Sequence, residues 1–134
     1  MLKMICSDVD GTLVPDGGHE LNPEYFSQIR RLKKAGILFA AVSGRSYSSL
    51  EKLFAPVLDD ILFICDNGAR TIYRGRVLNC HTIRRELAFE IIRDIEALPG
   101  CTTYVSALKS GYVKEGADEL YRWLTKGYLL DITK

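Results

Sequence analysis

The stretch that decides the fold class is Ile5-Cys6-Ser7-Asp8-Val9-Asp10-Gly11-Thr12-Leu13, which joins an apolar run to two carboxylates and a glycine. The short apolar run over 2–6 predicts a β-strand. In open α/β sheets, ligands bind at the carboxyl ends of strands, and alternation along this strand would place Asp8 and Asp10 on the same side. Two clustered carboxylates repel unless a cation or a proton relieves them, and Mg²⁺ is the hard, oxygen-seeking cation that suits such a pair.

Two simpler motifs share parts of this stretch. An EF-hand loop requires Asp or Asn at its fifth position and Gly at its sixth, where this chain has Thr12 and Leu13, so that loop is excluded. A plain Asp-Gly turn that closes a strand stays open as an alternative. Such a turn, however, does not require the upstream acid Asp8.

The stretch resembles the first motif of the haloacid dehalogenase (HAD) superfamily, Asp-x-Asp-Gly-Thr after a hydrophobic strand. The resemblance implies that Asp8 is the nucleophile that takes a phosphoryl group and that Asp10 is the general acid and base. It also implies a Mg²⁺ cofactor held by Asp8 and by the backbone carbonyl of Asp10. These roles agree with the chemistry, because a carboxylate is a weak nucleophile that needs a metal to orient it and to offset charge. A second acid can protonate the leaving alkoxide and later activate water.

A run of Ser43, Gly44 and Arg45 ends the second expected strand, as the acids end the first. A hydroxyl there, with the amides of Gly44 and Arg45 opening a helix, predicts a phosphate cradle. The superfamily's second motif is a Ser or Thr at this strand end, and Ser-Gly-Arg is typical of its Cof-like branch. The resemblance therefore implies that Ser43 binds the transferring phosphoryl group. Arg45 either reaches the phosphate too or is an ordinary surface residue at a helix start.

A third polar run, beginning with Asp66 and Asn67, follows the third expected strand, and Cof-like members carry a closely similar acid-Asn-Gly-Ala run there. Asn67 either lines the substrate pocket or forms an Asn-Gly turn that leads into a hairpin. Aromatic residues gather late in the chain, and either pack the core of the second part or form a specificity surface above the active site. We expect core packing for them: Tyr104, Tyr112, Tyr121, Trp123 and Tyr128.

Hydrophobic periodicity predicts an α/β fold. A strand, helix, strand, helix, strand order predicts a parallel, Rossmann-like sheet, and the unbroken apolar runs predict strands buried on both faces. We divide the chain into a core segment, residues 1–82, which resembles part of the HAD core, and a cap segment, residues 83–134, which resembles part of the family's α/β cap. The expected strands of the core segment are 1–7, 37–42 and 61–65, its helices 23–35 and 46–55, its loop 14–20 and its hairpin 71–78. The cap segment is expected to hold helices over 84–98 and 117–125 and strands over 102–108, 111–114 and 128–132.

Composition narrows the functional classes. The chain has 134 residues, of which 47% are hydrophobic and 26% charged, as in a globular domain. A net charge of +1 argues against nucleic acid or an anionic membrane as the main partner. We find neither a transmembrane run nor a signal-peptide pattern. Four cysteines without an export signal predict reduced thiols in the cytoplasm.

The family pattern also requires two motifs downstream of the cap, a Lys that neutralises the nucleophile and phosphate and a Gly-Asp-x-x-x-Asp run that completes the Mg²⁺ site. The sequence contains no Gly-Asp pair, and its late lysines fall inside the cap segment. The resemblance therefore implies a Mg²⁺-dependent phosphatase of small phosphorylated metabolites, acting through an aspartyl-phosphate on Asp8 and impaired in this short form. A truncated sheet exposes an edge, which predicts a homo-oligomer, a domain swap or a missing complementary fragment.

Two alternatives to catalysis stay open. In the first, the chain is a truncated or vestigial, non-catalytic HAD-like protein that binds metal or phosphate weakly, or serves as an assembly partner. In the second, the chain is a regulatory domain in which Asp8 accepts a phosphoryl group without rapid turnover. The Asp-Gly-Thr run and the cap-like second half count against the regulatory domain.

Overall fold

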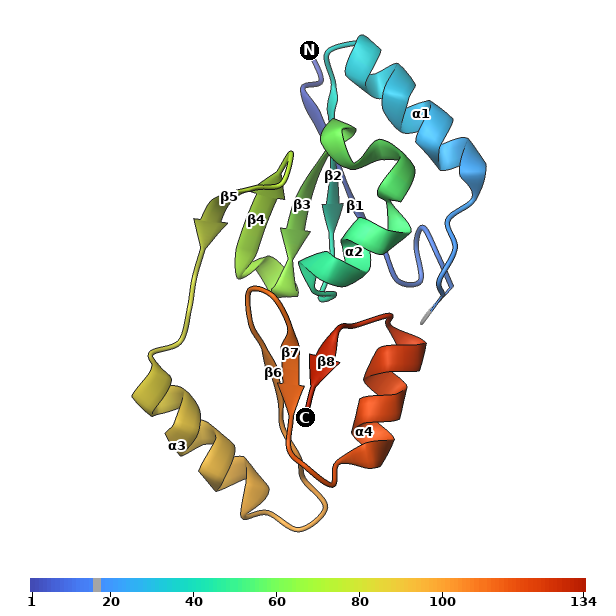
Figure 1. Ribbon diagram of the computed structural model, residues 1–134. Coiled ribbons are helices and arrows are strands. Elements are labelled where there is room, and N and C mark those ends of the chain that lie inside the picture. The colour runs from blue at the N-terminus through green and yellow to red at the C-terminus, as the bar shows by residue number, and fades with distance from the viewer. Residues whose placement is uncertain (16–17) are drawn as a thin grey trace.

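The computed structural model describes residues 1–15 and 18–134 and contains two sheets, drawn in Figure 1. The loop predicted over 14–20 contains Asp16 and Gly17, which lie outside the described residues. The larger sheet has the order β1-β2-β3-β4-β5 and the smaller one the order β6-β7-β8. In the described ranges, no helix is both long enough and apolar enough to cross a membrane.

The core segment forms the larger sheet, and the α/β fold prediction is confirmed. Its first three strands are parallel, and a hairpin of two further strands extends the same sheet in antiparallel fashion. The strands are β1 (Met4–Asp8), β2 (Leu38–Val42), β3 (Ile61–Cys65), β4 (Arg70–Tyr73) and β5 (Arg76–Cys80), connected in part by α1 (Pro23–Lys34) and α2 (Tyr47–Leu53).

The first helix starts and stops where the sequence predicts. The side chain of Asn22 accepts a hydrogen bond from the Glu24 amide at 3.0 Å, and Pro23 occupies the first turn. Gly36 follows the helix with a φ of 73°, the left-handed conformation that a glycine adopts at no steric cost. Helix α2 is shorter than predicted, because a 3₁₀ segment, η1 (Ala55–Asp60), carries the chain from it to β3.

Strand β1 lies at the edge of the larger sheet, so the prediction of a buried first strand was wrong. Met4, Cys6 and Asp8 are exposed, because β2 is the one strand that pairs with β1 among the described residues. The alternation argument fails too, because β1 ends at Asp8. The chain then turns sharply, and the amides of Leu13 and Val14 both donate to the carbonyl of Val9, at 2.9 and 3.0 Å.

The main apolar core lies between the larger sheet and α1, α2 and η1. Phe54 and Phe63 are fully buried with their ring centroids 5.8 Å apart in an edge-to-face contact. Tyr47 contacts Phe63 in the same manner at 5.6 Å. Such pairs add to the burial energy of the rings, so this cluster fixes α2 against β3.

The cap segment builds the smaller sheet with its own apolar cluster around Val113, Leu124 and Leu130. Figure 1 shows α3 and α4 on either side of this sheet. Gly111 lies against the ring of Tyr104, where any Cβ atom would clash. The elements are α3 (Arg85–Glu96), β6 (Tyr104–Ser106), β7 (Gly111–Val113), α4 (Asp118–Arg122), a π-helical turn η3 (Trp123–Gly127) and β8 (Ile132–Thr133).

The late aromatic residues divide into two groups. Tyr104, Tyr121 and Tyr128 pack against the apolar cluster of the cap segment, as expected. Tyr112 and Trp123 are exposed, so core packing was wrong for these two. Tyr112 lies on the short strand β7, and Trp123 begins η3, where its ring contacts Tyr128 on one side only.

Candidate active site

The carboxylate of Asp8 is exposed at the carboxyl end of β1. Asp8 lies opposite Val42 in the β1–β2 register, so Ser43 follows at the neighbouring strand end. The hydroxyl of Thr12 donates to Asp8 Oδ2 at 3.5 Å. The sheet topology therefore places the predicted nucleophile and the predicted phosphate-binding serine at the same edge.

Asp10 and Arg45 form a bidentate ion pair. Arg45 Nη2 lies 2.7 Å from Asp10 Oδ1, and Nε lies 2.9 Å from Oδ2. Nη2 also donates to the carbonyl of Gly18 at 2.8 Å, and Nη1 donates to Ser49 Oγ at 3.4 Å. Such a fork fixes both the position and the orientation of a carboxylate.

Arg45 is buried, with a side chain 1% exposed, which rules out the alternative of an ordinary surface residue. Its guanidinium also lies 5.3 Å from the ring centroid of Tyr128 in the cap segment. The predicted contact between Arg45 and phosphate stays a prediction. The described structure gives the side chain another set of partners, and that set includes the predicted acid/base.

Backbone hydrogen bonds join the loop after β2 to the loop after β3. The Asn67 amide donates to the carbonyl of Ser43 at 3.2 Å, and the Asp66 amide donates to the carbonyl of Arg45 at 3.0 Å. A Cβ atom on Gly44 would lie 3.0 Å from Asn67 Oδ1. The structure thus brings Ser43, Gly44 and Asn67 together.

One element of the predicted phosphate cradle was wrong. Helix α2 begins at Tyr47, so the amides of Gly44 and Arg45 do not open a helix. The Arg45 amide donates instead to Ser43 Oγ at 3.1 Å. A serine hydroxyl that accepts this bond can still donate its own proton, so phosphate binding by Ser43 stays a prediction.

Asp66 and Asn67 form a turn with a rare backbone conformation. Their φ angles are 52° and 53°, and Gly68 follows at 91°. Asp and Asn tolerate the left-handed region better than other non-glycine residues. The Asn-Gly turn is therefore present, while the pocket role of Asn67 stays a prediction.

A cavity of about 240 Å³ lies where the cap segment meets Asp10 and Arg45. We call it the junction pocket. Asp10, Gly44, Arg45 and Ser46 line it from the core segment, and mostly apolar side chains line it from the cap segment: Tyr104, Trp123, Leu124, Tyr128 and Leu130. Three of the late aromatic residues, Tyr104, Trp123 and Tyr128, therefore line the same cavity as the predicted acid/base.

Two sets of polar contacts hold the cap segment over the core segment. On one side, Arg70 Nε binds Asp66 Oδ2 at 2.6 Å, and Arg70 Nη1 donates to the carbonyl of Leu108 at 3.0 Å. Ser106 Oγ donates to the other oxygen of Asp66 at 2.6 Å. Sequence analysis missed Arg70, because no local pattern marks a bond that spans 38 residues.

The second set of contacts comes from α2. Ser49 Oγ donates to the carbonyl of Tyr128 at 2.6 Å, and Lys52 Nζ donates to the carbonyl of Leu129 at 2.9 Å. Lys52 also pairs with Asp131 at 2.7 Å. These bonds hold the 128–131 segment against the helix that follows Arg45, and Tyr128 and Leu130 of that segment line the junction pocket.

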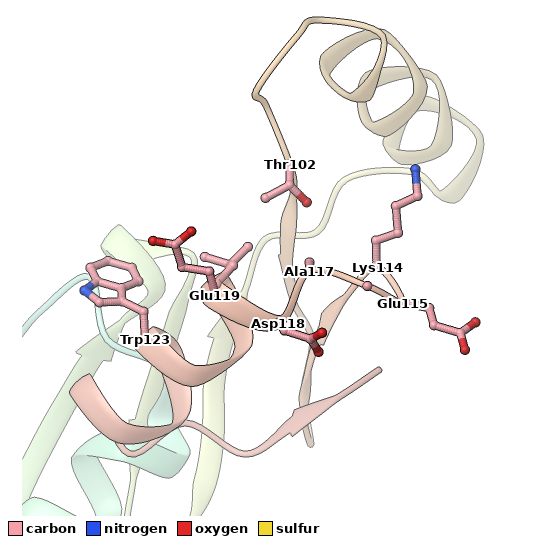
Figure 2. Close-up of a pocket in the computed structure, with 9 residues that line it drawn as sticks. Thr102, Lys114, Glu115, Ala117, Asp118, Glu119 and Trp123 are labelled. Atoms are coloured by element: carbon pink, nitrogen blue, oxygen red, sulfur yellow. The ribbon is translucent and has the colours of Figure 1, made fainter.

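A larger, open cavity of about 750 Å³ lies within the cap segment, shown in Figure 2. Its lining contains none of the predicted site residues, so we do not place the chemistry there. Trp123 lines both cavities. The larger cavity is otherwise lined by Thr102, Lys114, Glu115, Gly116, Ala117, Asp118, Glu119 and Leu120.

The donor set for Mg²⁺ is incomplete. The described residues contain no cluster of three or more His, Cys, Asp or Glu side chains that could hold a metal ion. Arg45 engages both oxygens of Asp10, which leaves the exposed carboxylate of Asp8 as the main donor. Because Mg²⁺ binds phosphates through one or two carboxylates and several waters, this set fits the ion in part.

Comparison with known proteins decides the family. The family of haloacid dehalogenase-like hydrolases matches residues 5–129. The chain belongs to the haloacid dehalogenase-like hydrolase family. A crystal structure from Eubacterium rectale superposes on this haloacid dehalogenase-like chain with a TM-score of 0.83 at 31% identity, covering 99% of this chain and 51% of the other. A sugar phosphatase of HAD subclass IIB shares the fold, with a TM-score of 0.75 at 18% identity and coverages of 98% and 52%.

The curated relatives of this haloacid dehalogenase-like chain are phosphatases. Phosphoglycolate phosphatase 1 of Saccharolobus solfataricus is 32% identical over 91 residues, which is 67% of this chain and 40% of the relative. The 5-amino-6-(5-phospho-D-ribitylamino)uracil phosphatase of Escherichia coli is 21% identical over 127 residues, which is 95% of this chain and 47% of the relative. The chain spans about half the length of these relatives.

Proposed function

We propose that this chain carries the nucleophile and the acid/base of a phosphatase that hydrolyses phosphate monoesters of small metabolites. The observation that carries the proposal is the placement of Asp10, which Arg45 holds at the junction pocket, two residues from the exposed Asp8. The relatives named above support it, because each is named for hydrolysis of a phosphate ester. Their substrates differ, one a small acid and the other a ring-bearing compound.

In the proposed reaction, an oxygen of Asp8 forms a bond to phosphorus while the bond between phosphorus and the alcohol oxygen breaks. Asp10 enters this proposed cycle protonated and gives its proton to that oxygen, so the alcohol leaves. A water then attacks the phosphorus of the aspartyl-phosphate, and Asp10 takes a proton from it. The bond from Asp8 to phosphorus breaks, so inorganic phosphate leaves and both acids return to their starting states. Ser43 and the Gly44 amide are the proposed donors to the phosphoryl oxygens.

The proposed cofactor is Mg²⁺, held by the Asp8 carboxylate and the Asp10 carbonyl. When bound, it would offset the charge of the nucleophile and the phosphoryl group. Arg45 supports the reaction through Asp10, whose orientation it fixes. All four cysteines are free thiols, which supports the further proposal of a reducing, cytoplasmic location.

The exposed edge of β1 supports a proposal on assembly. An unpaired edge strand is a template for a second chain, and the strand in question carries Asp8. We therefore propose that full activity needs a homo-oligomer or a complementary fragment. Light scattering on the purified chain tests the first case. A strict monomer that hydrolyses esters without any added protein contradicts both.

The deciding experiment is hydrolysis of p-nitrophenyl phosphate by the purified chain, with and without Mg²⁺. The test variant is Asp8→Asn, and the matched control is Asp94→Asn, an exposed carboxylate on α3. We expect Mg²⁺-dependent hydrolysis that Asp8→Asn abolishes and Asp94→Asn leaves intact. Equal rates for the parent, Asp8→Asn and the buffer blank contradict catalysis by this chain. They favour the alternative of a non-catalytic phosphate or metal binder.

A further inference from the structure

The wall of the junction pocket that comes from the cap segment is aromatic and aliphatic. The rings of Trp123 and Tyr128 meet edge to face, with centroids 4.9 Å apart and planes at 69°. Leu124 and Leu130 are buried beside them. Trp123 itself is 56% exposed, so much of its ring is available to a ligand. Such a wall attracts a flat, apolar group.

The charges at the pocket are already compensated. Asp10 and Arg45 are the charged residues in its described lining. Every nitrogen of the Arg45 guanidinium bonds to a protein acceptor, shared among Asp10, Gly18 and Ser49. A substrate carboxylate that entered here would lose its hydration shell without meeting an uncommitted cation from this lining. The pocket therefore disfavours an acidic alcohol.

The size of the pocket limits the ligand further. Its volume of about 240 Å³ lies below the range of roughly 300–1,000 Å³ that holds drug-sized ligands. It suits one small ring rather than a long or branched group. Because Asp10 borders it, the group that fills it is the alcohol portion of the ester, next to the oxygen that Asp10 protonates.

We propose that the substrate is a phosphate monoester whose alcohol portion is uncharged and carries a flat ring, which packs against Trp123 in the junction pocket. This inference rests on the proposed function, since that function places the phosphoryl group at Asp8. The two curated relatives described above are named for a small acid and for a ring-bearing alcohol, and the inference assigns this chain to the second class.

The first test is a binding titration with two phosphonates that no phosphatase can hydrolyse. Benzylphosphonate carries a phenyl ring where phosphonoacetate carries a carboxylate. The chain has one tryptophan, Trp123, which lines both the junction pocket and the larger cavity, so its fluorescence reports on a ligand in either place. Glu119→Ala, which alters the larger cavity alone, should leave the response unchanged. We expect benzylphosphonate to bind about tenfold more tightly, because a contact between rings adds attraction beyond their buried area. Equal affinities, or tighter binding of phosphonoacetate, overturn the inference.

The second test uses calorimetry on two variants. Trp123→Ala removes the ring from the pocket, and Tyr112→Ala removes an exposed aromatic residue of the same segment that does not line it. Because both side chains are exposed, we expect both variants to fold. Trp123→Ala should weaken benzylphosphonate about tenfold and leave inorganic phosphate unchanged, while Tyr112→Ala should change neither. An unchanged benzylphosphonate affinity in Trp123→Ala overturns the inference.

Inorganic phosphate separates failure of the inference from failure of the proposed function. If phosphate binds and Asp8→Asn abolishes hydrolysis, but the two phosphonates bind equally, the function stands and the ring preference falls. If neither phosphate nor either phosphonate binds, both fall. A ring preference in a chain that hydrolyses nothing supports the inference on substrate recognition and removes the catalytic part of the proposal.

Discussion

Arg45 donates hydrogen bonds to both carboxylate oxygens of Asp10. The two side chains are buried to different extents, because the arginine is 1% exposed and the aspartate 25%. The buried Arg45 cation therefore depends more strongly on this ion pair than Asp10 does. A buried charge that loses its partner is strongly destabilising, whereas a charge that is a quarter exposed can regain water. Asp10 therefore has a structural role, as the counter-ion of a buried cation, that the exposed Asp8 does not share.

Removal of either acid should abolish hydrolysis, but only one removal should destabilise the fold. Asp10→Ala leaves the Arg45 cation buried and should lower the free energy of unfolding by about 3 kcal/mol. Asp8→Ala removes an exposed side chain and should change that free energy by less than about 0.5 kcal/mol. Urea unfolding of both variants measures the difference. Equal stabilities would show that the ion pair contributes nothing to the fold.

Arg45→Lys should keep the positive charge and lose the bidentate contact with Asp10. A lysine can meet one oxygen of Asp10, not both, so the carboxylate loses its fixed orientation. We expect a lower kcat with a smaller loss of stability than in Asp10→Ala. If Arg45 acts directly on phosphate, KM should rise instead while kcat stays near the parent value.

The two links between the segments should differ in strength. Arg70 and Asp66 are nearly buried, and Arg70→Ala should cost about 3 kcal/mol because it leaves the Asp66 carboxylate without this partner. Lys52→Ala breaks a pair that is half exposed on both sides and should cost less than about 1 kcal/mol. Urea unfolding compares them. A larger loss in Lys52→Ala would contradict the assignment of the main link to Arg70.

Gly44→Ala should disturb Asn67 more than the fold. The new Cβ atom would stand 3.0 Å from Asn67 Oδ1, and an exposed amide can move by a few tenths of an ångström. We therefore expect a nearly unchanged free energy of unfolding and weaker binding of inorganic phosphate. The double variant Gly44→Ala/Asn67→Ala isolates the contact, because the penalty should shrink when the amide is absent. If the effects of the two single substitutions on phosphate binding simply add, the contact between Gly44 and Asn67 is not the cause of the weaker binding.

The cysteines should react with a thiol reagent in a fixed order. Burial raises the pKa of the Cys65 thiol to about 12, so it stays protonated and inert at pH 8, while Cys6 and Cys101 are exposed. Ellman's reagent should titrate these two first, Cys80 later and Cys65 only in urea.

The raised pKa of Cys65 also makes the free energy of unfolding depend on pH. The unfolded Cys65 thiol ionises near the ordinary cysteine pKa of 9.0 and the folded one does not, so the stabilising contribution is complete below that pH. It is then lost as pH rises from 9.0 toward 12. A Cys65→Ala variant should show a weaker decline in stability across that range. A Cys65 that reacts as fast as Cys101 would contradict its burial.

Local signals were enough to predict the main elements of the core segment. The cap at Asn22, the glycine at 36 and the turn at Arg74-Gly75 each act on neighbouring residues, and all three hold in the structure. The strand ends at Asp8 and Ser43 were also predictable, because parallel strands align their carboxyl ends.

Distant contacts were not predictable in the same way. Arg45 and Asp10 are separated by 35 residues, and no periodicity marks a pair that forms only when β1 and β2 align. The exposure of β1 depends on which strand lies beyond it, which is a property of the sheet and not of the strand. The aromatic wall of the junction pocket arises where two segments meet, so residue type alone could not separate it from a core.

The open edge of β1 has a thermodynamic consequence for any measurement of affinity. Whatever chain pairs with that edge acts on the same strand that carries Asp8. Two ligands that bias one element are linked reciprocally, so a partner that steadies β1 would tighten substrate binding, and substrate would tighten the partner by the same factor. If the chain pairs with itself at that edge, as proposed, a dissociation constant measured at one protein concentration describes a mixture of assembly states, and its change with protein concentration measures the coupling.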